Sequence, residues 1–361
     1  MSTNVAQANV RKFNFHVSYL NGFALISIIF IHLIDWSNLS ISPSAQIIKD
    51  FLRAGVILFV FVAGAVTFMA YEGRTLIEST KRLLRRGIET LFFYYLYSLI
   101  KLFIFNFSTQ PFYEQFIGIG KFSFLDILKF RSFSVPITIL ITFAFLFMFS
   151  PVLLYIHKKT KSPIRNIALL IAGLLGINYL TSIPSLNNPI IKFLYSDGFV
   201  LFPLALWIVP FALGFFVAQN GFEKQKKKVL IVSGLITFFY GVIYFVQQKS
   251  LLPYDYEFPL SLYFISSGIF FASLLLYLFW YLEHVHKTWI MKIMAGLRLL
   301  GDNTLNLYLF HWIVIDCTIW MFSPHTDLIL VSVPLFFVLY FIFNREKYAK
   351  YYISQKGLST S

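Results

Sequence analysis

Long apolar runs separated by short polar segments dominate the chain. Runs such as FALISIIFIHLI, ILFVFVAGAVTFM and LLLYLFWYL lie in segments near the roughly 20 residues that cross about 30 Å of hydrocarbon. In the hydrocarbon core of a membrane, a segment with this pattern can satisfy the hydrogen bonds of its own backbone only as a helix. The pattern therefore predicts an all-α polytopic membrane bundle. Windows bounded by charge clusters place about ten transmembrane helices at about 17–36, 51–71, 87–107, 135–157, 166–183, 199–219, 229–247, 259–282, 304–322 and 326–344.

Composition strengthens the membrane assignment. Of the 361 residues, 58% are hydrophobic and 13% are charged, whereas soluble domains carry about 25% charged residues. The single cysteine, Cys317, lies inside a predicted span, which excludes an intrachain disulfide framework. The polar N-terminus precedes a full-length span without a convincing cleavage site, so we expect it to be retained. We predict one integral membrane domain over 1–361, with short cytoplasmic tails at about 1–16 and 345–361.

The net charge of +14 is explained by where the basic residues lie. With a cytoplasmic N-terminus, most of the 30 Lys and Arg residues fall in the segments that would face the cytoplasm. Both termini are therefore predicted to be cytoplasmic. Because orientation accounts for most of the positive charge, we expect membrane lipid, and no nucleic acid, as a partner.

The first predicted span carries three polar residues that lipid alone does not explain. Asn21 and His32 are 11 residues apart, about 16 Å of helical rise, on nearly the same face. Asp35 follows His32 by three residues, and a neighbouring carboxylate can fix the tautomer of an imidazole that acts as a general base. Alternatively, Asp35 lies at the outer interface beside the belt residue Trp36. His32 and Asp35 are the candidate catalytic residues.

The ninth predicted span begins LLGDNTLNLYLFHWIVID. Asp302 and Asn303 are ordinary candidates for a helix N-cap. Capping does not explain His311, which lies about two turns into an apolar helix and is expected to face the bundle interior, either as a structural hydrogen-bonding group or as a site residue. Tyr308 lies one turn before it. We consider Asn21, Tyr308 and His311 as contacts to a substrate or a tetrahedral intermediate.

The third predicted span follows a basic cluster. Orientation explains most of that cluster, which would also attract an anionic donor or lipid headgroups. We expect Glu89 at the inner interface beside these cations, and Lys101 snorkelling to the outer interface. The chain has no zinc pattern, phosphate loop, dinucleotide fingerprint or nucleophile elbow, so no metal is predicted. The candidate donor-binding residues are Lys81, Arg82, Arg85 and Arg86.

Four segments, in order, resemble the multispanning membrane acyltransferases, which include the family-three acyltransferases and the heparan-alpha-glucosaminide N-acetyltransferase-like proteins. YLNGFALISIIFIHLID is similar to their opening helix, in which Gly22 and His32 match the family pattern. The other three are ILFVFVAGAVTFMAYEGR with the KRLLRR that follows it, SDGFVLFPLALWIVPFALGFFVAQ at 196–219, and LLGDNTLNLYLFHWIV at 299–314.

The resemblance implies a donor, an acceptor and a base. The donor would be an acyl-CoA, with acetyl-CoA favoured, on the cytoplasmic face. The acceptor would be a hydroxyl or amine of a glycan or lipid-linked carbohydrate on the far face, in a bacterial inner or cytoplasmic membrane. His32 would match the family's catalytic histidine, and His311 the histidine of its terminal motif.

The chain departs from the family pattern at two positions of the first helix. Asn21 stands where the family has arginine, and Ser18 where it has aspartate; asparagine cannot reproduce the bidentate anion contact of arginine. An inactive family member is therefore one alternative to an acyltransferase. A proton-coupled transporter or lipid-linked-sugar flippase is another, with His32, Asp35 and Glu89 as its proton relay.

Overall fold

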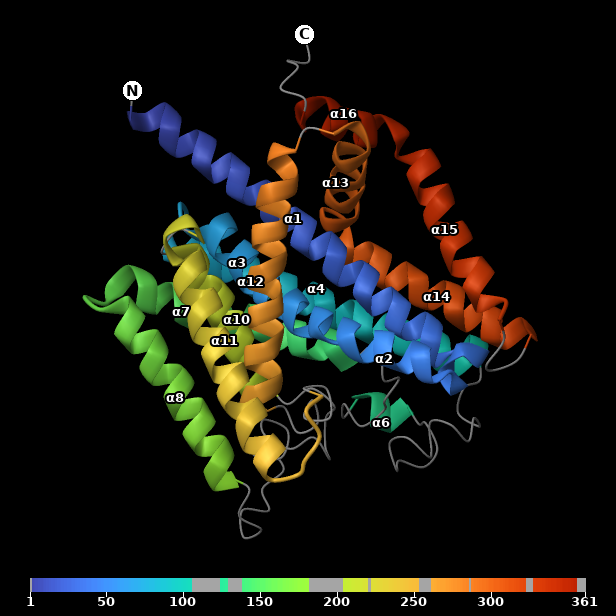
Figure 1. Ribbon diagram of the computed structural model, residues 1–361, viewed down its shortest axis with the longest axis horizontal. Coiled ribbons are helices and arrows are strands. Elements are labelled where there is room, and N and C mark those ends of the chain that lie inside the picture. The colour runs from blue at the N-terminus through green and yellow to red at the C-terminus, as the bar shows by residue number, and fades with distance from the viewer. Residues whose placement is uncertain are drawn as a thin grey trace. The chain divides into compact units, whose positions relative to one another are not determined.

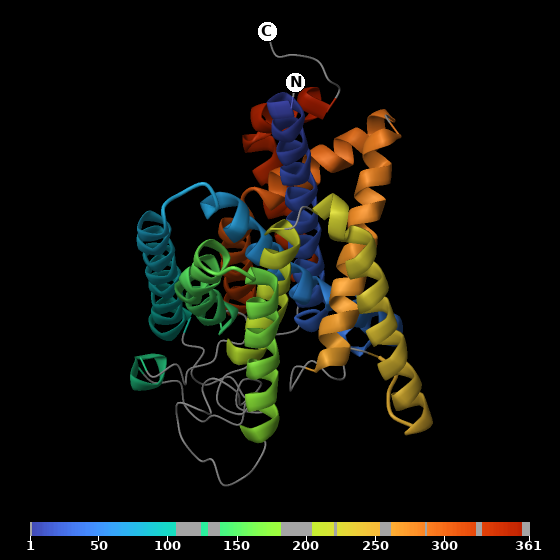
Figure 2. The same ribbon diagram turned by 90° about the vertical axis from the view of Figure 1, so that its left-hand side faces the viewer.

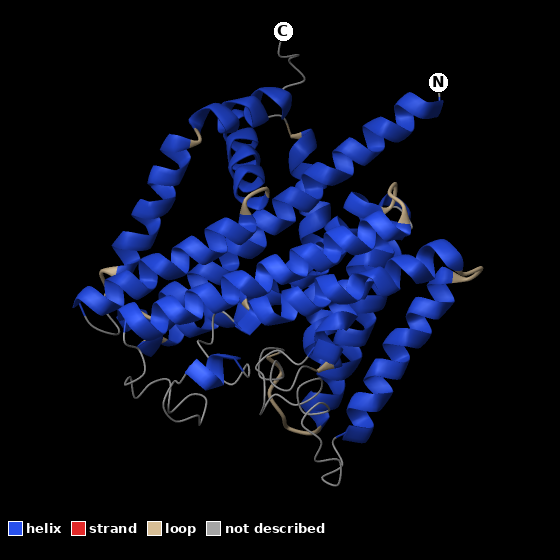
Figure 3. Cartoon of the chain, turned by 180° about the vertical axis from the view of Figure 1, so that it is seen from behind, coloured by secondary structure: helices blue, strands red, loops and turns tan. Residues whose placement is uncertain are grey.

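The computed structural model describes residues 2–105, 124–128, 138–181, 204–219, 222–252, 261–285, 287–322 and 327–355. Every regular element in these ranges is a helix, as Figure 3 shows. The predicted all-α polytopic bundle is therefore confirmed. The chain divides into two compact units, with the division inside α3 (Ala54–Tyr71), after Val62.

The first unit comprises Met1–Val62, Gly221–Glu257 and Ser261–Ser361. Its central helix is α1, which packs on α2, α12, α13 and α14, while α11 pairs with α12 (Figures 1 and 2). Besides the start of α3, its elements are α1 (Ser2–Asp35), η1 (Asn38–Ile41), α2 (Pro43–Leu52), α11 (Phe222–Val246), α12 (Leu262–His284), α13 (Thr288–Gly301), α14 (Thr304–Phe322), α15 (Ile329–Phe343) and α16 (Arg345–Gln355).

Two glycines allow α1 and α13 to approach each other closely. A Cβ on Gly22 of α1 would lie 2.1 Å from the carbonyl oxygen of Leu297 in α13, and one on Gly301 would lie 1.9 Å from that of Ser18. No real Cβ atom is found so close to a backbone oxygen, so only glycine permits this approach. The sequence thereby brings the end of α13 against the backbone of α1.

The second unit comprises Ala63–Asn220 and Phe258–Leu260. In it α4 packs along α7, and α10 packs on α7 and α8. The side chain of Thr75 begins α4 by accepting a hydrogen bond from the backbone N–H of Glu78, an ordinary N-cap. The elements after α3 are α4 (Leu76–Ile100), η2 (Lys101–Phe105), α6 (Phe124–Leu128), α7 (Thr138–Lys159), α8 (Pro163–Thr181) and α10 (Leu204–Gln219).

Six helical segments among the described residues are long and apolar enough to cross a membrane. A seventh is possible if α15 and α16, which bend by 71° at their junction, form one span. These segments correspond to seven of the ten predicted spans; the other three coincide with α4, α8 and α10. The prediction of ten crossings and of cytoplasmic termini stays a prediction. The six segments are Phe15–Asp35, Pro43–Tyr71, Ile139–Lys159, Lys227–Val246, Leu262–His284 and Thr304–Phe322.

Two local expectations change in the structure. Lys101 does not snorkel outward: only 1% of it is exposed, and its Nζ lies 5.6 Å from the ring centroid of Tyr97. The α13 helix forms between the predicted spans 259–282 and 304–322, where no span was expected. Its buried residues recur at helical spacing, as in Ile290, Met294 and Leu297, so it is an amphipathic helix packed against α1.

Candidate active site

His32 lies three residues before the end of α1, in the first unit. Its side chain is partly exposed, whereas its neighbours Ile31 and Leu33 are buried. The indole of Trp312 in α14 packs against it, with ring centroids 4.4 Å apart. His32 is therefore packed against an aromatic neighbour and is still partly exposed.

The α14 helix adds two further ring groups to this cluster. The ring of His311 is nearly parallel to that of His32, with an angle of 16° between planes and 5.6 Å between centroids. Tyr308 meets His311 edge-on at 5.3 Å and lies beside Phe59 of α3 at 6.2 Å. His311 is fully buried and Tyr308 is 3% exposed. The structure thus brings together three of the sequence-predicted site residues, His32, Tyr308 and His311.

Asp35 has a different partner from the one considered in the sequence. Its Oδ1 accepts a hydrogen bond from Lys49 Nζ of α2 at 2.5 Å, an ion pair whose side chains are 31% and 12% exposed. Lys49 and Arg53 lie within electrostatic range of His32. The helix end that carries His32 is therefore tied to the α2–α3 junction through Asp35.

Asn21 lies apart from the ring cluster, because 11 residues of continuous helix separate it from His32 by about 16 Å. Its Nδ2 donates to the carbonyl oxygen of Gly301 at 3.0 Å, and Ser18 Oγ donates to Asp302 Oδ1 at 2.7 Å. Tyr351 of α16 donates to the other oxygen of Asp302 at 2.5 Å. The two positions that depart from the family pattern therefore both bind the end of α13.

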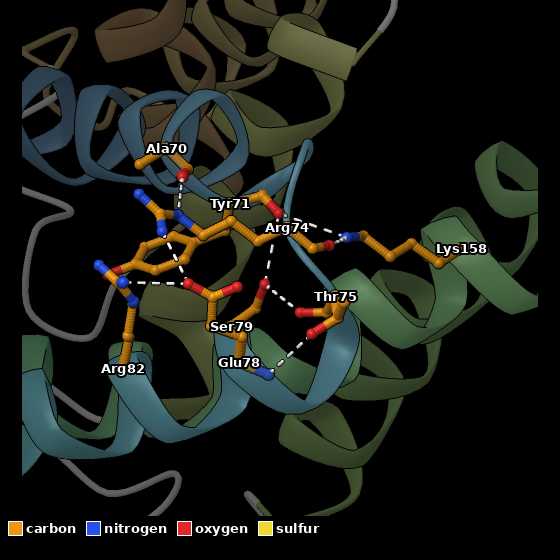
Figure 4. Close-up of polar contacts among 8 residues, drawn as sticks. All are labelled: Ala70, Tyr71, Arg74, Thr75, Glu78, Ser79, Arg82 and Lys158. Carbon is orange, nitrogen blue, oxygen red and sulfur yellow. Dashed lines mark hydrogen bonds and ion pairs between the residues drawn. The ribbon is translucent and has the colours of Figure 1, made fainter.

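The basic cluster Lys81, Arg82, Arg85 and Arg86 lies on α4 in the second unit. Arg82 pairs with Glu78, which also binds Arg74, as Figure 4 shows. In the same view Lys158 of α7 donates to the backbone carbonyls of Tyr71 and Arg74, which holds the α3–α4 turn.

The remaining members of the cluster differ in their contacts. Arg85 pairs with Glu89 at 2.8 Å, which confirms that Glu89 lies beside the cations. The guanidinium of Arg86 lies 5.1 Å from the ring centroid of Phe147. Lys81 is exposed, and the described residues give it no hydrogen bond or ion pair. Lys81 is therefore the cation of this cluster most open to an anionic ligand.

Comparison with known families identifies the chain. Residues 16–344 match the family model for an acyltransferase domain, that of the family-three acyltransferases. The chain belongs to this family. No curated protein matches it. Together with its apolar helices, the match makes this chain an integral, multi-pass membrane acyltransferase.

Sequence reasoning assigned no contact between helices to three residues of the first unit. Trp312 is the nearest ring to His32, but it reads as an ordinary apolar residue of a span. Asp302 reads as a helix cap, yet it binds α1 and α16. Asp316, fully buried on α14, was visible only as a polar residue after His311. The contacts of Trp312 with His32 and of Asp302 with Ser18 join segments far apart in the sequence, which no local pattern reveals. Among the described residues, no group of three His, Cys, Asp or Glu could hold a metal ion.

Proposed function

We propose that this acyltransferase moves an acyl group, with acetyl favoured, from acyl-CoA on the cytoplasmic face to a hydroxyl or amine of a cell-envelope carbohydrate. The glycan or lipid-linked acceptor would be reached from the other face of a bacterial inner or cytoplasmic membrane. The observation that carries this proposal is His32, which is partly exposed and packed against the rings of Trp312 and His311 on α14.

In this mechanism His32 is the general base. Its ring nitrogen takes the proton of the acceptor hydroxyl or amine as that group attacks the thioester carbonyl. Tyr308, at the edge of His311, is the candidate hydrogen-bond donor to the oxyanion. Asn21 is about three turns from His32, so its role is confined to the α1–α13 contact.

Asp35 acts indirectly in this proposal. Its ion pair with Lys49 fixes the end of α1 and hence the position of His32. The proposed donor contacts on α4 are Lys81 and Arg86, supported by Arg82 and Arg85, because phosphates bind Lys and Arg strongly. Lys81 is the first of these to test, since its ammonium group is exposed.

The test uses the full-length protein in lipid nanodiscs with acetyl-CoA and a bacterial envelope glycan fraction. Thiol release and glycan mass are followed together, with empty nanodiscs as the control. We expect release of free CoA that matches an added acetyl mass on the glycan. A glycan that crosses reconstituted vesicles without any added mass would support the transporter alternative and contradict the proposal.

A further inference from the structure

The two ring nitrogens of His311 have different surroundings. Nδ1 lies 3.3 Å from the backbone carbonyl oxygen of Leu307, one turn earlier in α14. A carbonyl oxygen only accepts hydrogen bonds, so Nδ1 must carry the hydrogen that is donated to it. The helix backbone therefore sets the tautomer of His311.

The other nitrogen, Nε2, is a buried acceptor. A neutral imidazole carries one ring hydrogen, so with Nδ1 protonated Nε2 presents a lone pair. None of the described residues gives Nε2 a hydrogen-bond partner, and the side chain has no exposed surface. Unsatisfied buried polar atoms are uncommon and often mark a functional role. In this tautomer His311 cannot donate a hydrogen bond to an oxyanion.

Of the three rings beside His311, those of His32, Tyr308 and Trp312, only the imidazole of His32 can take up a proton and then donate it in a hydrogen bond. Two imidazoles joined by an N–H···N bond of about 2.9 Å have centroids roughly 5 Å apart, and the centroids of His32 and His311 are 5.6 Å apart. The separation in the structure is slightly larger than that of a bonded pair, so the His32 ring must move when the bond forms. His32 is partly exposed whereas His311 is fully buried, so His32 is the histidine of the pair that a substrate can contact.

We propose that His311 is a positioning residue whose Nε2 accepts a hydrogen bond from His32 once His32 has taken the substrate's proton. The proposal rests on the proposed function for its transfer step and deepens it. The hydrogen bond stabilises the imidazolium of His32 in the transition state, without any exchange of the proton with His311.

The step balances around His32. The O–H or N–H bond of the acceptor breaks, its proton goes to a ring nitrogen of His32, and its electron pair forms a bond to the thioester carbonyl carbon. The carbon–sulfur bond then breaks, and the departing thiolate receives the proton from His32. His311 returns to its starting state and needs no co-reactant.

Three substitutions of His311 separate this role from packing. His311→Gln can place an amide oxygen near the position of Nε2, whereas His311→Asn reaches only the position of Nδ1. His311→Phe keeps a ring beside His32 and Trp312 but has no acceptor. We expect kcat for acyl transfer to fall about 100-fold in Phe and Asn with KM nearly unchanged, in line with the contribution of one positioned proton-handling group, and Gln to restore at least tenfold.

Tautomer spectroscopy gives a readout that does not depend on catalysis. Nitrogen-15 histidine NMR of the full-length protein, with the His311 signal assigned by its loss in His311→Phe, should show hydrogen on Nδ1 and a bare Nε2. Hydrogen on Nε2 would overturn the proposal, and so would a His311→Phe enzyme that retains kcat within threefold. If wild type shows no acyl transfer at all, the proposed function fails, and the NMR result still decides the tautomer.

Discussion

The two halves of the α1 span are held by different kinds of contact. In the N-terminal half, Gly22 and Ser18 contact the backbone and the end of α13, through a glycine crossing and hydrogen bonds to residues next to it. In the C-terminal half, His32 contacts the rings of α14. Among these rings, Nε2 of His311 has no hydrogen-bond partner among the described residues. In the N-terminal half the polar side chains of Ser18 and Asn21 both have hydrogen-bond partners, whereas the ring cluster at the C-terminal half contains a nitrogen that has none. Reactivity is therefore expected only in the second half.

The largest effect on stability is expected from Trp312→Ala. Trp312 is 2% exposed and contacts His32 and Trp36 by its ring. Removing such a buried indole typically costs about 3–5 kcal/mol, so the thermal unfolding midpoint in detergent should drop and acyl transfer should fall with it. An unchanged midpoint would mean that the ring cluster does not support α14 against α1.

Gly22→Ala tests the contact between the N-terminal half of the α1 span and α13. Its Cβ would clash with the carbonyl oxygen of Leu297, and overpacking of this kind costs about 1–3 kcal/mol. We expect a lower unfolding midpoint, with the turnover of the remaining folded protein close to wild type. Gly173→Ala in α8 is the matched control, because nothing lies within 4 Å of its added Cβ. Equal midpoints for the two variants would contradict the close crossing.

Ser18→Ala should have a smaller effect on the same half. It removes one hydrogen bond to Asp302 while Tyr351 still donates to that carboxylate, so a loss of about 0.5–1.5 kcal/mol in stability is expected. Denaturation with and without Tyr351→Phe measures the coupling between the two donors. Strictly additive losses would show that Asp302 does not join α1 to α16 as one network.

The smallest effect is expected from the ion pair at the end of α1. Lys49→Met removes the partner of Asp35 from a partly exposed site, and such pairs contribute about 0.2–1 kcal/mol. A double-mutant cycle with Asp35→Asn should give a coupling in this range that weakens at high salt. A coupling of several kcal/mol would place Asp35 in the buried site and revive its direct role beside His32.

The sequence predicted the class of fold and the two helices that carry the candidate site. Hydrophobic runs indicate α1 and α14 directly, and polar residues within them singled out His32, Tyr308 and His311. The roles of α13 and Trp312 were not predictable, because amphipathic periodicity alone does not say which helix a face will contact. The partner of Asp35 was missed for a related reason. Helical spacing places Asp35 beside His32, but in the structure Asp35 pairs with Lys49 of the next helix, α2.

The most direct test of the account is the rate of acyl transfer by His32→Ala compared with His284→Ala. His284 is an exposed histidine at the end of α12, outside the ring cluster, and serves as the matched control. Loss of a general base predicts a fall in kcat of about 100-fold to 10,000-fold for His32→Ala, with His284→Ala near wild type and both unfolding midpoints preserved. Equal transfer rates for the two folded variants would contradict the assignment of His32 as the base.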